Sequence, residues 1–371
     1  MITLGEVFRR YGPAYREKMG NRLSANQRAA MAAIEQCRTE ALGGQVYTCP
    51  RCATVRYSYH SCRNRHCPTC QHDKAQSWLT KQQAVRLPVP YFLVTFTLPA
   101  ELRTIARQHP RRLYGLLFRS SATALQQLAA DPRFLGGQIG MVGVLQTWTR
   151  DLRYHPHIHY LVPAGAFASV EGRWVRAKGR FLVHVKPLGK LFRGKMRAGL
   201  RQLKLEAAVA PAVWGKAWVV DCRAVGSGEA ALKYLAPYVF RVALSNNRLE
   251  AMVNEEVTFR YRVAESKKLK RCTLSAEAFI QRFLQHVLPK GFVKVRYFGL
   301  FSPSRRAILA EVRALIGVAS DESVGASSEV RVTVVVDEQH GQVVCCPRCG
   351  AVMEVTMVLV PVSRSPPGGR E

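Results

Sequence analysis

Two Cys-x2-Cys pairs lie close together near the start of the chain, Cys49 with Cys52 and Cys67 with Cys70, and 14 residues separate them. Each pair can form a tight turn that presents two thiolates to one metal ion, and two such turns complete the tetrahedral four-sulfur shell that structural zinc prefers. A redox pair or a cluster of buried thiols is the alternative, but a redox Cys-x2-Cys usually opens a helix after a strand. The spacing therefore predicts one Zn2+ site with a closed shell, which stabilises a small N-terminal domain.

Other cysteines in the chain could form additional metal sites. Cys37, His60, Cys62 and His66 lie around the same pairs and could form a second site or replace one of the four predicted ligands. The segment "CCPRCG" adds Cys345, Cys346 and Cys349 far downstream, with His340 nearby. A single Cys-x2-Cys pair is half a zinc site, to be completed by these neighbours or by another segment.

The charge of the chain favours a polyanionic partner. Its 371 residues contain 55 Lys and Arg against 25 Asp and Glu, a formal net charge of +30, and such an excess speeds the capture of nucleic acid. An anionic membrane is the weaker alternative, because no apolar run approaches the ~20 residues of a spanning helix. The first residues also lack a basic-then-apolar signal peptide. We therefore expect a soluble cytoplasmic protein that binds nucleic acid.

One basic stretch is free of acids. Residues 173–204 contain 11 Lys or Arg and no Asp or Glu, with aromatic side chains interleaved. A solvated helix face usually mixes both signs of charge. The composition therefore favours a surface that follows phosphates.

Alternating strand-like and helix-like segments predict an α+β fold. "PYFLVTFTLP", "IGMVGVLQTW" and "HIHYLVPAGAF" have the branched and aromatic composition of strands, whereas roughly 100–131 and 187–209 have helical patterns. We expect three regions: a helical and zinc-binding domain, an α+β domain that is large enough to contain an active site, and a C-terminal region with a disordered tail. Their predicted limits are 1–82, 88–300 and 301–371.

The segment "YHPHIHYLV" places histidines at every second position. On a strand, His157 and His159 point to the same face while Ile158 points into the core. Two imidazoles on one face can bind a divalent cation and leave coordination positions open for a substrate. Cross-strand polar packing is the common alternative for a histidine pair.

Two tyrosines occur in "EAALKYLAPYVF". If this segment is helical, Tyr234 and Tyr238 are four residues apart and share a face. Tyrosine can act as a covalent nucleophile when a metal or a base offsets its high pKa. Two core aromatics on an amphipathic helix are the alternative.

Taken together, "SCRNRHCPTCQ", "HPHIH" and "YLAPY" followed by "RVALSNNRL" resemble the two-tyrosine HUH transposases of rolling-circle-type insertion sequences, which carry an N-terminal zinc-binding domain. The resemblance covers roughly residues 25–305. It implies a ferredoxin-like sheet flanked by helices, with Mg2+ or Mn2+ held by His157 and His159. It further implies that Tyr234 or Tyr238 attacks single-stranded DNA and becomes linked to its 5′ end.

The third ligand of that metal stays open, with His155, Gln146 and Glu229 as candidates. Two alternative functions also remain: a replication initiator or relaxase with the same chemistry, and a zinc-dependent DNA-binding regulator without catalysis. We expect a bacterial, nucleoid-associated protein with no membrane partner, and leave self-association into a homo-oligomer open.

Overall fold

Five strands rich in branched and aromatic residues form the central sheet: β3 (Pro90–Thr97), β4 (Gly140–Trp148), β5 (Tyr154–Pro163), β8 (Val220–Ser227) and β12 (Val295–Gly299). Their order is β12-β4-β5-β3-β8, and every neighbouring pair is antiparallel. The computed structural model describes residues 2–70, 80, 82, 86–178, 181–230, 232, 239, 243–263, 266, 268–317 and 343–361.

Two helices connect the strands in a β-α-β-β-α-β sequence. Helix α5 (Pro110–Ala130) joins β3 to β4, and α6 (Val185–Gln202) joins β5 to β8. With the spatial order β4-β5-β3-β8, this connectivity is ferredoxin-like. The predicted α+β class, an antiparallel sheet flanked by helices, is therefore confirmed.

The long helix expected over residues 100–131 is interrupted. A short α4 (Arg103–Gln108) ends before His109, and α5 starts again at Pro110. Proline has no backbone N–H, so it fits the first position of a helix but breaks a continuous one.

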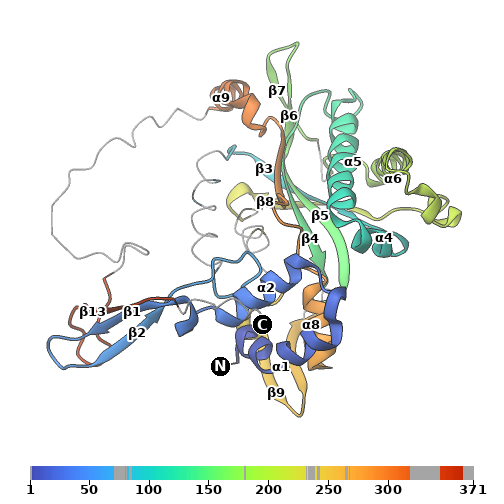
Figure 1. Cartoon of the computed structure of the whole chain (residues 1–371). Helices are drawn as coiled ribbons and strands as arrows, with labels where there is room; N and C mark the ends of the chain where they lie inside the picture. Colours follow the sequence, from blue (N-terminus) through green and yellow to red (C-terminus); the bar gives the residue numbers. More distant parts are fainter. Residues whose placement is uncertain are drawn as a thin grey trace, which may run out of the picture.

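Helices α4, α5 and α6 cover one face of the sheet (Figure 1). Phe96 of β3 packs edge-on against Phe192 of α6, with ring centroids 5.0 Å apart. Tyr160 of β5 is fully buried and its hydroxyl is 2.8 Å from that of Ser121 in α5. Ile158 and Tyr160 belong to this core, so the alternating residues His157 and His159 face the opposite side of the sheet.

The second face of the sheet has its own apolar cluster. Val144 and Leu161 of the sheet share it with Leu232 and Val239, and α9 (Arg306–Leu315) contributes Val312. A hairpin of β6 (Gly165–Ala168) and β7 (Arg173–Arg176) extends from the end of this region.

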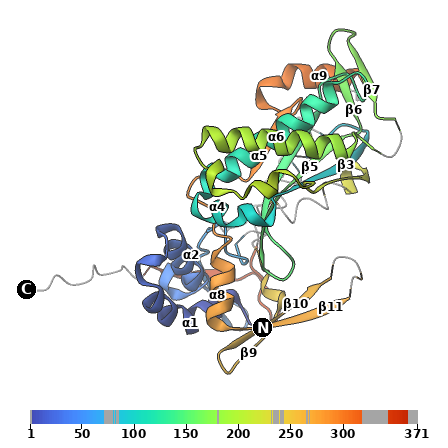
Figure 2. The same ribbon diagram turned by 90° about the vertical axis from the view of Figure 1, so that its right-hand side faces the viewer.

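A second body combines the start of the chain with residues 249–284 (Figure 2). Helices α1 (Leu4–Met19) and α2 (Ala25–Gln36) pack against α8 (Ala276–Leu284) and the sheet of β9 (Leu249–Val253), β10 (Glu256–Arg262) and β11 (Leu269–Ser275). The rings of Phe8 and Phe283 lie 5.6 Å apart at its centre. The side chains of Ser24 and Ser275 cap the N-termini of α2 and α8. The domain limits at 82, 88 and 300 stay a prediction.

A three-stranded ribbon protrudes from this body (Figure 1). It consists of β1 (Gly44–Thr48), β2 (Val55–Tyr59) and β13 (Glu354–Leu359), in the order β13-β1-β2. Both pairings are antiparallel, so a strand from the far end of the sequence completes an N-terminal sheet.

Short 3-10 helices connect several elements: Gly20–Arg22, Glu40–Leu42, Ala100–Leu102, Glu206–Ala208, Pro211–Trp214, Asn246–Arg248 and Pro303–Arg305. None of the described helices has the length and apolarity needed to cross a membrane.

Candidate active site and metal centres

The predicted histidine face is present on β5. His157 is buried, His159 is partly buried, and their ring centroids lie 4.8 Å apart. Both occupy the sheet face opposite α5 and α6, since Ile158 between them is fully buried in the helix-side core. The two imidazoles are therefore close enough to bind one cation.

Hydrogen bonds orient both rings. The Nδ1–H of His157 donates to the carbonyl of His155 at 2.6 Å, and His159 Nδ1 is 2.8 Å from Thr95 Oγ1 on β3. Burial lowers the pKa of His157 to about 4 and the pKa of His159 to about 3. Both rings are therefore neutral near pH 7, which is the form that ligates metals, and Nε2 is the nitrogen that each ring would offer.

Gln146 of β4 joins the pair. It is the register partner of His157, and its Oε1 lies 3.1 Å from His157 Nε2. Its amide Nε2 is buried with no hydrogen-bond partner among the described residues. With His157 Nδ1 already donating, its Nε2 is an acceptor that faces the side-chain amide of Gln146. The amide can present its oxygen beside that nitrogen to a shared cation, or turn over and donate an N–H to the ring when no cation is bound. The donor set of two imidazoles and one amide oxygen thus fits a divalent metal.

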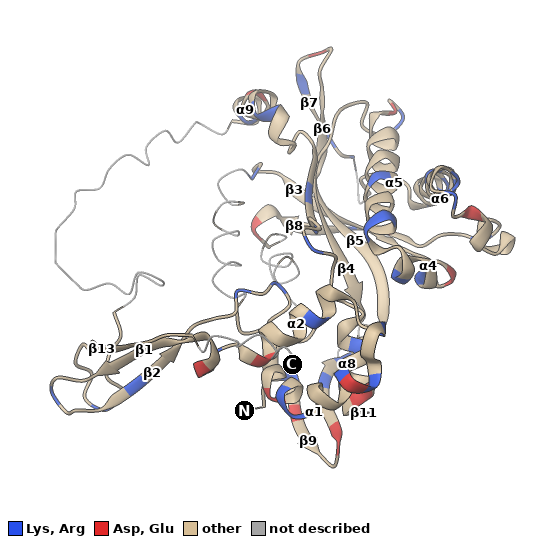
Figure 3. Ribbon diagram, viewed as in Figure 1, with Lys and Arg blue, Asp and Glu red and all other residues tan. Residues whose placement is uncertain are grey.

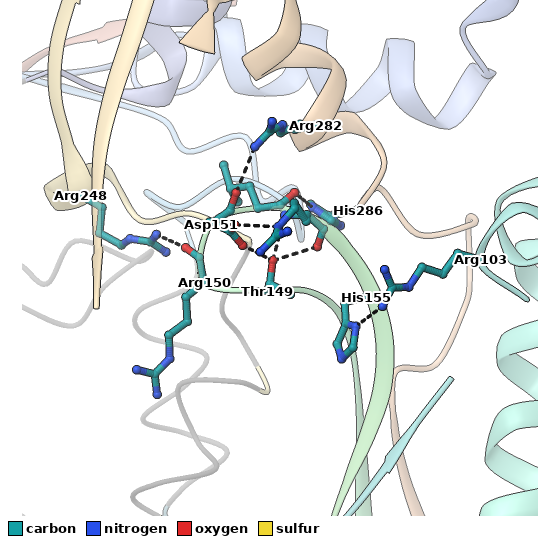
Figure 4. Close-up of polar contacts among 10 residues, drawn as sticks. Arg103, Thr149, Arg150, Asp151, His155, Arg248, Arg282 and His286 are labelled. Carbon is teal, nitrogen blue, oxygen red and sulfur yellow. Dashed lines mark hydrogen bonds and ion pairs between the residues drawn. The ribbon is translucent and has the colours of Figure 1, made fainter. Parts of the chain in front are cut away.

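The other two candidates for a third ligand form no described three-donor group with the histidine pair. His155 Nδ1 accepts a hydrogen bond of 2.7 Å from Arg103 Nη2 at the start of α4 (Figure 4). Burial and then the Arg103 charge lower the pKa of His155, so this ring is also held neutral. Glu229 is exposed beyond β8, and it joins no described group of acidic, histidine or cysteine donors within 4.8 Å of one another.

Sequence reasoning missed Thr95 and Arg103, which orient His159 and His155. The alternation of "TFT" in β3 puts Thr95 and Thr97 on one face of that strand. It could have indicated their position beside His159 and His157 only if the pairing of β3 with β5 had been known.

Tyr234 and Tyr238 lie outside the described residues. Their described neighbours Leu232 and Val239 are both buried, and both belong to the apolar cluster that contains Val144 and Leu161. Val144 is the register partner of His159. Leu161 follows His159 by two residues on β5 and therefore lies on the same face of the sheet. The segment that contains the tyrosines is thus bounded by residues on the histidine face.

The loop between β4 and β5 links this site to the second body (Figure 4). Arg248 donates to the carbonyl of Arg150 at 2.5 Å, and His286 Nε2 donates to the carbonyl of Leu152 at 3.1 Å. Leu152 itself is fully buried in the core of α1 and α8. The strand ends that carry Gln146 and His157 are therefore fixed by the N-terminal body.

The cysteines form two separate clusters. Cys37, Cys62, Cys67 and Cys70 make the first, and Cys49, Cys52, Cys346 and Cys349 make the second. The expectation of a single site from Cys49, Cys52, Cys67 and Cys70 is therefore wrong. Each predicted Cys-x2-Cys turn has a different partner: Cys37 Sγ lies 3.2 Å from Cys70 Sγ, whereas Cys49 Sγ lies 3.4 Å from Cys349 Sγ.

The nearby histidines do not belong to either cluster. His66 Nε2 accepts a hydrogen bond of 3.3 Å from the backbone N–H of Leu288. Burial lowers the pKa of His66 to about 3, so this ring is a neutral acceptor between the zinc-binding region and the end of α8. His60 is also absent from both groups, and His340 lies outside the described residues.

Lys and Arg residues are spread over many elements, including α5, α6, α9, α2 and β2 (Figure 3). The acid-free stretch of residues 173–204 forms β7 and α6, and α6 covers the sheet face opposite the histidines. Arg197 and Arg201 of this helix pair with Glu206, whereas Lys186 and Lys190 are exposed. The basic helix α6 is therefore on the far side of the sheet from the candidate site.

Comparisons with known proteins agree with the zinc-binding N-terminal region and with the domain that contains the histidine site. Residues 7–98 match the family model "Transposase zinc-binding domain" and residues 140–307 match "Putative transposase". Over 98% of its length the chain is 39% identical to "Putative transposase y4qJ" of Sinorhizobium fredii, covering 97% of that protein. It is also 31% identical over 72% of its length to "Transposase for insertion sequence element IS801" of Pseudomonas savastanoi pv. phaseolicola, covering 68% of that protein. No solved structure matches the chain.

Residues 7–98 include the whole first cysteine cluster, which supports structural zinc. Membership among transposases implies DNA as the substrate and cleavage with strand transfer as the reaction. The chain belongs to the insertion-sequence transposases with an N-terminal zinc-binding domain, as the sequence resemblance implied.

Proposed function

We propose that this transposase nicks and rejoins single-stranded DNA through a tyrosine nucleophile, in rolling-circle-like transposition within the bacterial cytoplasm at the nucleoid. The observation that supports the proposal is the position of Leu232 and Val239, the described residues on either side of the two tyrosines. His157, His159 and Gln146 lie on the face where Leu232 and Val239 bound the segment of Tyr234 and Tyr238. A metal site and a pair of phenols on one face are the parts that this chemistry requires.

His157, His159 and Gln146 would hold Mg2+ or Mn2+, with Thr95 and the His155 carbonyl fixing the two rings. When bound, the metal supplies Lewis-acid polarisation of the scissile phosphate. Arg103, held beside the histidines by His155, is placed to contact a flanking phosphate.

In the proposed step, the phenol oxygen of Tyr234 or Tyr238 attacks phosphorus and the bond from phosphorus to the 3′ oxygen breaks. The phenol loses its proton, and the 3′ oxygen leaves as a hydroxyl after taking up a proton. The 5′ end remains as a phosphotyrosine, so the energy of the broken diester is retained for rejoining. The paired tyrosine would accept the second strand.

A covalent-adduct assay tests the proposal. Full-length protein is incubated with 5′- and 3′-labelled single-stranded DNA and Mn2+, and the products are separated on a denaturing gel. An adduct with the 5′-phosphate fragment is expected from the wild-type chain and from Tyr57→Phe, an exposed tyrosine of the ribbon. The double variant Tyr234→Phe/Tyr238→Phe should yield none.

His157→Ala separates chemistry from binding in the same assay. Cleavage should fall to background while DNA affinity stays within about threefold, because basic surfaces away from the site carry most of the affinity. Cleavage products without any adduct would indicate a nuclease that uses water, and binding without cleavage by the wild-type chain would favour the non-catalytic regulator.

A further inference from the structure

We infer that Cys49, Cys52, Cys346 and Cys349 form a second four-thiolate zinc site, which unites both ends of the chain in one zinc ribbon. Two of these cysteines lie in the region matched by the zinc-binding family model, but Cys346 and Cys349 lie outside residues 7–98 and 140–307. The inference concerns the architecture of the N-terminal domain and does not depend on the proposed tyrosine chemistry.

The sulfur atoms are arranged as a tetrahedral site requires. Cys49 Sγ is 3.4 Å from Cys349 Sγ, Cys52 Sγ is 3.5 Å from Cys346 Sγ, and all four atoms lie within 4.8 Å of one another. With zinc–sulfur bonds of about 2.3 Å, the edge of a tetrahedron is about 3.8 Å. The cluster is therefore compatible with closure around one ion by small side-chain movements.

The two Cys-x2-Cys turns have the same backbone structure. In the first, Ala53 N–H donates to Cys49 O at 2.9 Å and Cys49 N–H donates to Thr54 O at 2.9 Å. In the second, Gly350 N–H donates to Cys346 O at 2.9 Å and Cys346 N–H donates to Ala351 O at 2.8 Å.

The residue after each second cysteine is left-handed, with φ of 55° at Ala53 and 73° at Gly350. Alanine rarely adopts this conformation without compensation, so its occurrence here indicates a turn fixed by what the thiolates bind. The two turns are thus matched halves of one site.

Packing alone gives little stability to the ribbon. Within the part of the chain that the structure describes, its apolar cluster has four buried members, Tyr47, Cys49, Cys346 and Met353, and two of them are cysteines. Strand β13 exposes Met357 and Val358 to solvent at 58% and 65%. Such a small core does not usually hold a three-stranded sheet together without a metal or a disulfide, so metal binding is what fixes β13 beside β1.

Cys345 provides a matched control. It is exposed, immediately precedes Cys346, and belongs to neither cluster. Zinc content of purified full-length protein is expected to be two ions per chain for the wild type and for Cys345→Ser. Cys346→Ser/Cys349→Ser should bind one ion. One ion per wild-type chain, or two in the double variant, would overturn the second site.

Two further measurements cover the case of a variant that folds poorly. Wild-type protein loaded with 113Cd should give two distinct cadmium NMR signals of the tetrathiolate type, and a single such signal would refute the inference. Hydrogen exchange should show that residues 354–359 lose protection in Cys346→Ser/Cys349→Ser but keep it in Cys345→Ser. Full protection in the double variant would mean that β13 does not depend on the metal.

Discussion

Gln146 occupies a position where an amide side chain is costly unless it has a function. Its Nε2 is buried without a partner among the described residues, and such a group costs about 1–3 kcal/mol. In Gln146→Leu the buried His157 Nε2 also loses its polar neighbour, so the free energy of unfolding should stay within about 1 kcal/mol of the wild type, while Mn2+ affinity falls at least tenfold. Titration followed by Mn2+ electron paramagnetic resonance measures the affinity, with the exposed Gln202→Leu as control. Unchanged Mn2+ binding would remove Gln146 from the proposed ligand set.

His286 gives the fold a sensitivity to acid. Its Nε2–H donates to Leu152 O and its Nδ1 accepts from Thr147 Oγ1 at 3.2 Å, and burial lowers its pKa to about 4. Below an unfolded-state pKa of about 6.5 the unfolded chain binds the proton that the folded chain excludes. Stability is therefore present above pH 6.5 and is lost as the pH falls towards 4, by about 3 kcal/mol for this ring.

His286→Gln tests this contribution, because the amide keeps a donor for Leu152 but does not titrate. Urea unfolding at several pH values between 7 and 4 should give a shallower loss of stability than in the wild type. The exposed His184→Gln should reproduce the wild-type slope. Equal slopes in all three proteins would show that His286 is not a source of the acid sensitivity.

At the scale of elements, the β4–β5 loop connects the histidine site to the N-terminal body. Leu152 is fully buried there at a φ of 64°, unusual for leucine. Leu152→Ala should lower the free energy of unfolding by about 2–4 kcal/mol through the cavity that it leaves. Chemical denaturation measures this, and Val170→Ala, at a residue that is 95% exposed, should have no effect. A change below about 1 kcal/mol in Leu152→Ala would mean that the loop is not anchored through this side chain.

The elements themselves were largely predictable, whereas their long-range pairing was not. Alternation in "HIHYLV" and "PYFLVTFT" is local information, and it was enough to place His157 and His159 on one face. A Cys-x2-Cys spacing defines each turn but does not say which turn shares its metal. That choice depends on the pairing of β1 with β13, which joins Gly44 to Leu359, and on Cys37 at the end of α2. Gln146 could be named only as a candidate ligand from the sequence. Its position beside His157 depends on the register between β4 and β5, which the sequence does not reveal.

For the whole molecule, the net charge of +30 predicted a nucleic-acid partner but could not say where the charge lies in space. The acid-free stretch is contiguous in sequence, yet its helix α6 lies on the sheet face away from the histidines. We therefore expect DNA affinity and chemistry to belong to different faces of one sheet. A basic helix on the far face can hold a neighbouring stretch of DNA without touching the phosphate that is cut.

This separation predicts a variant that loses affinity but keeps its cleavage rate. In Lys186→Ala/Lys190→Ala, two exposed charges of α6 are removed, so the slope of log affinity against log salt should become shallower by about 1–2 for every DNA sequence tested. The cleavage rate at saturating DNA should be unchanged, because neither lysine lies on the histidine face. Arg133→Ala is the matched control, since Asp131 already pairs with Arg133 at 2.6 Å. An unchanged salt slope would remove α6 from the DNA-binding surface, and a slower saturated rate would place it at the reaction.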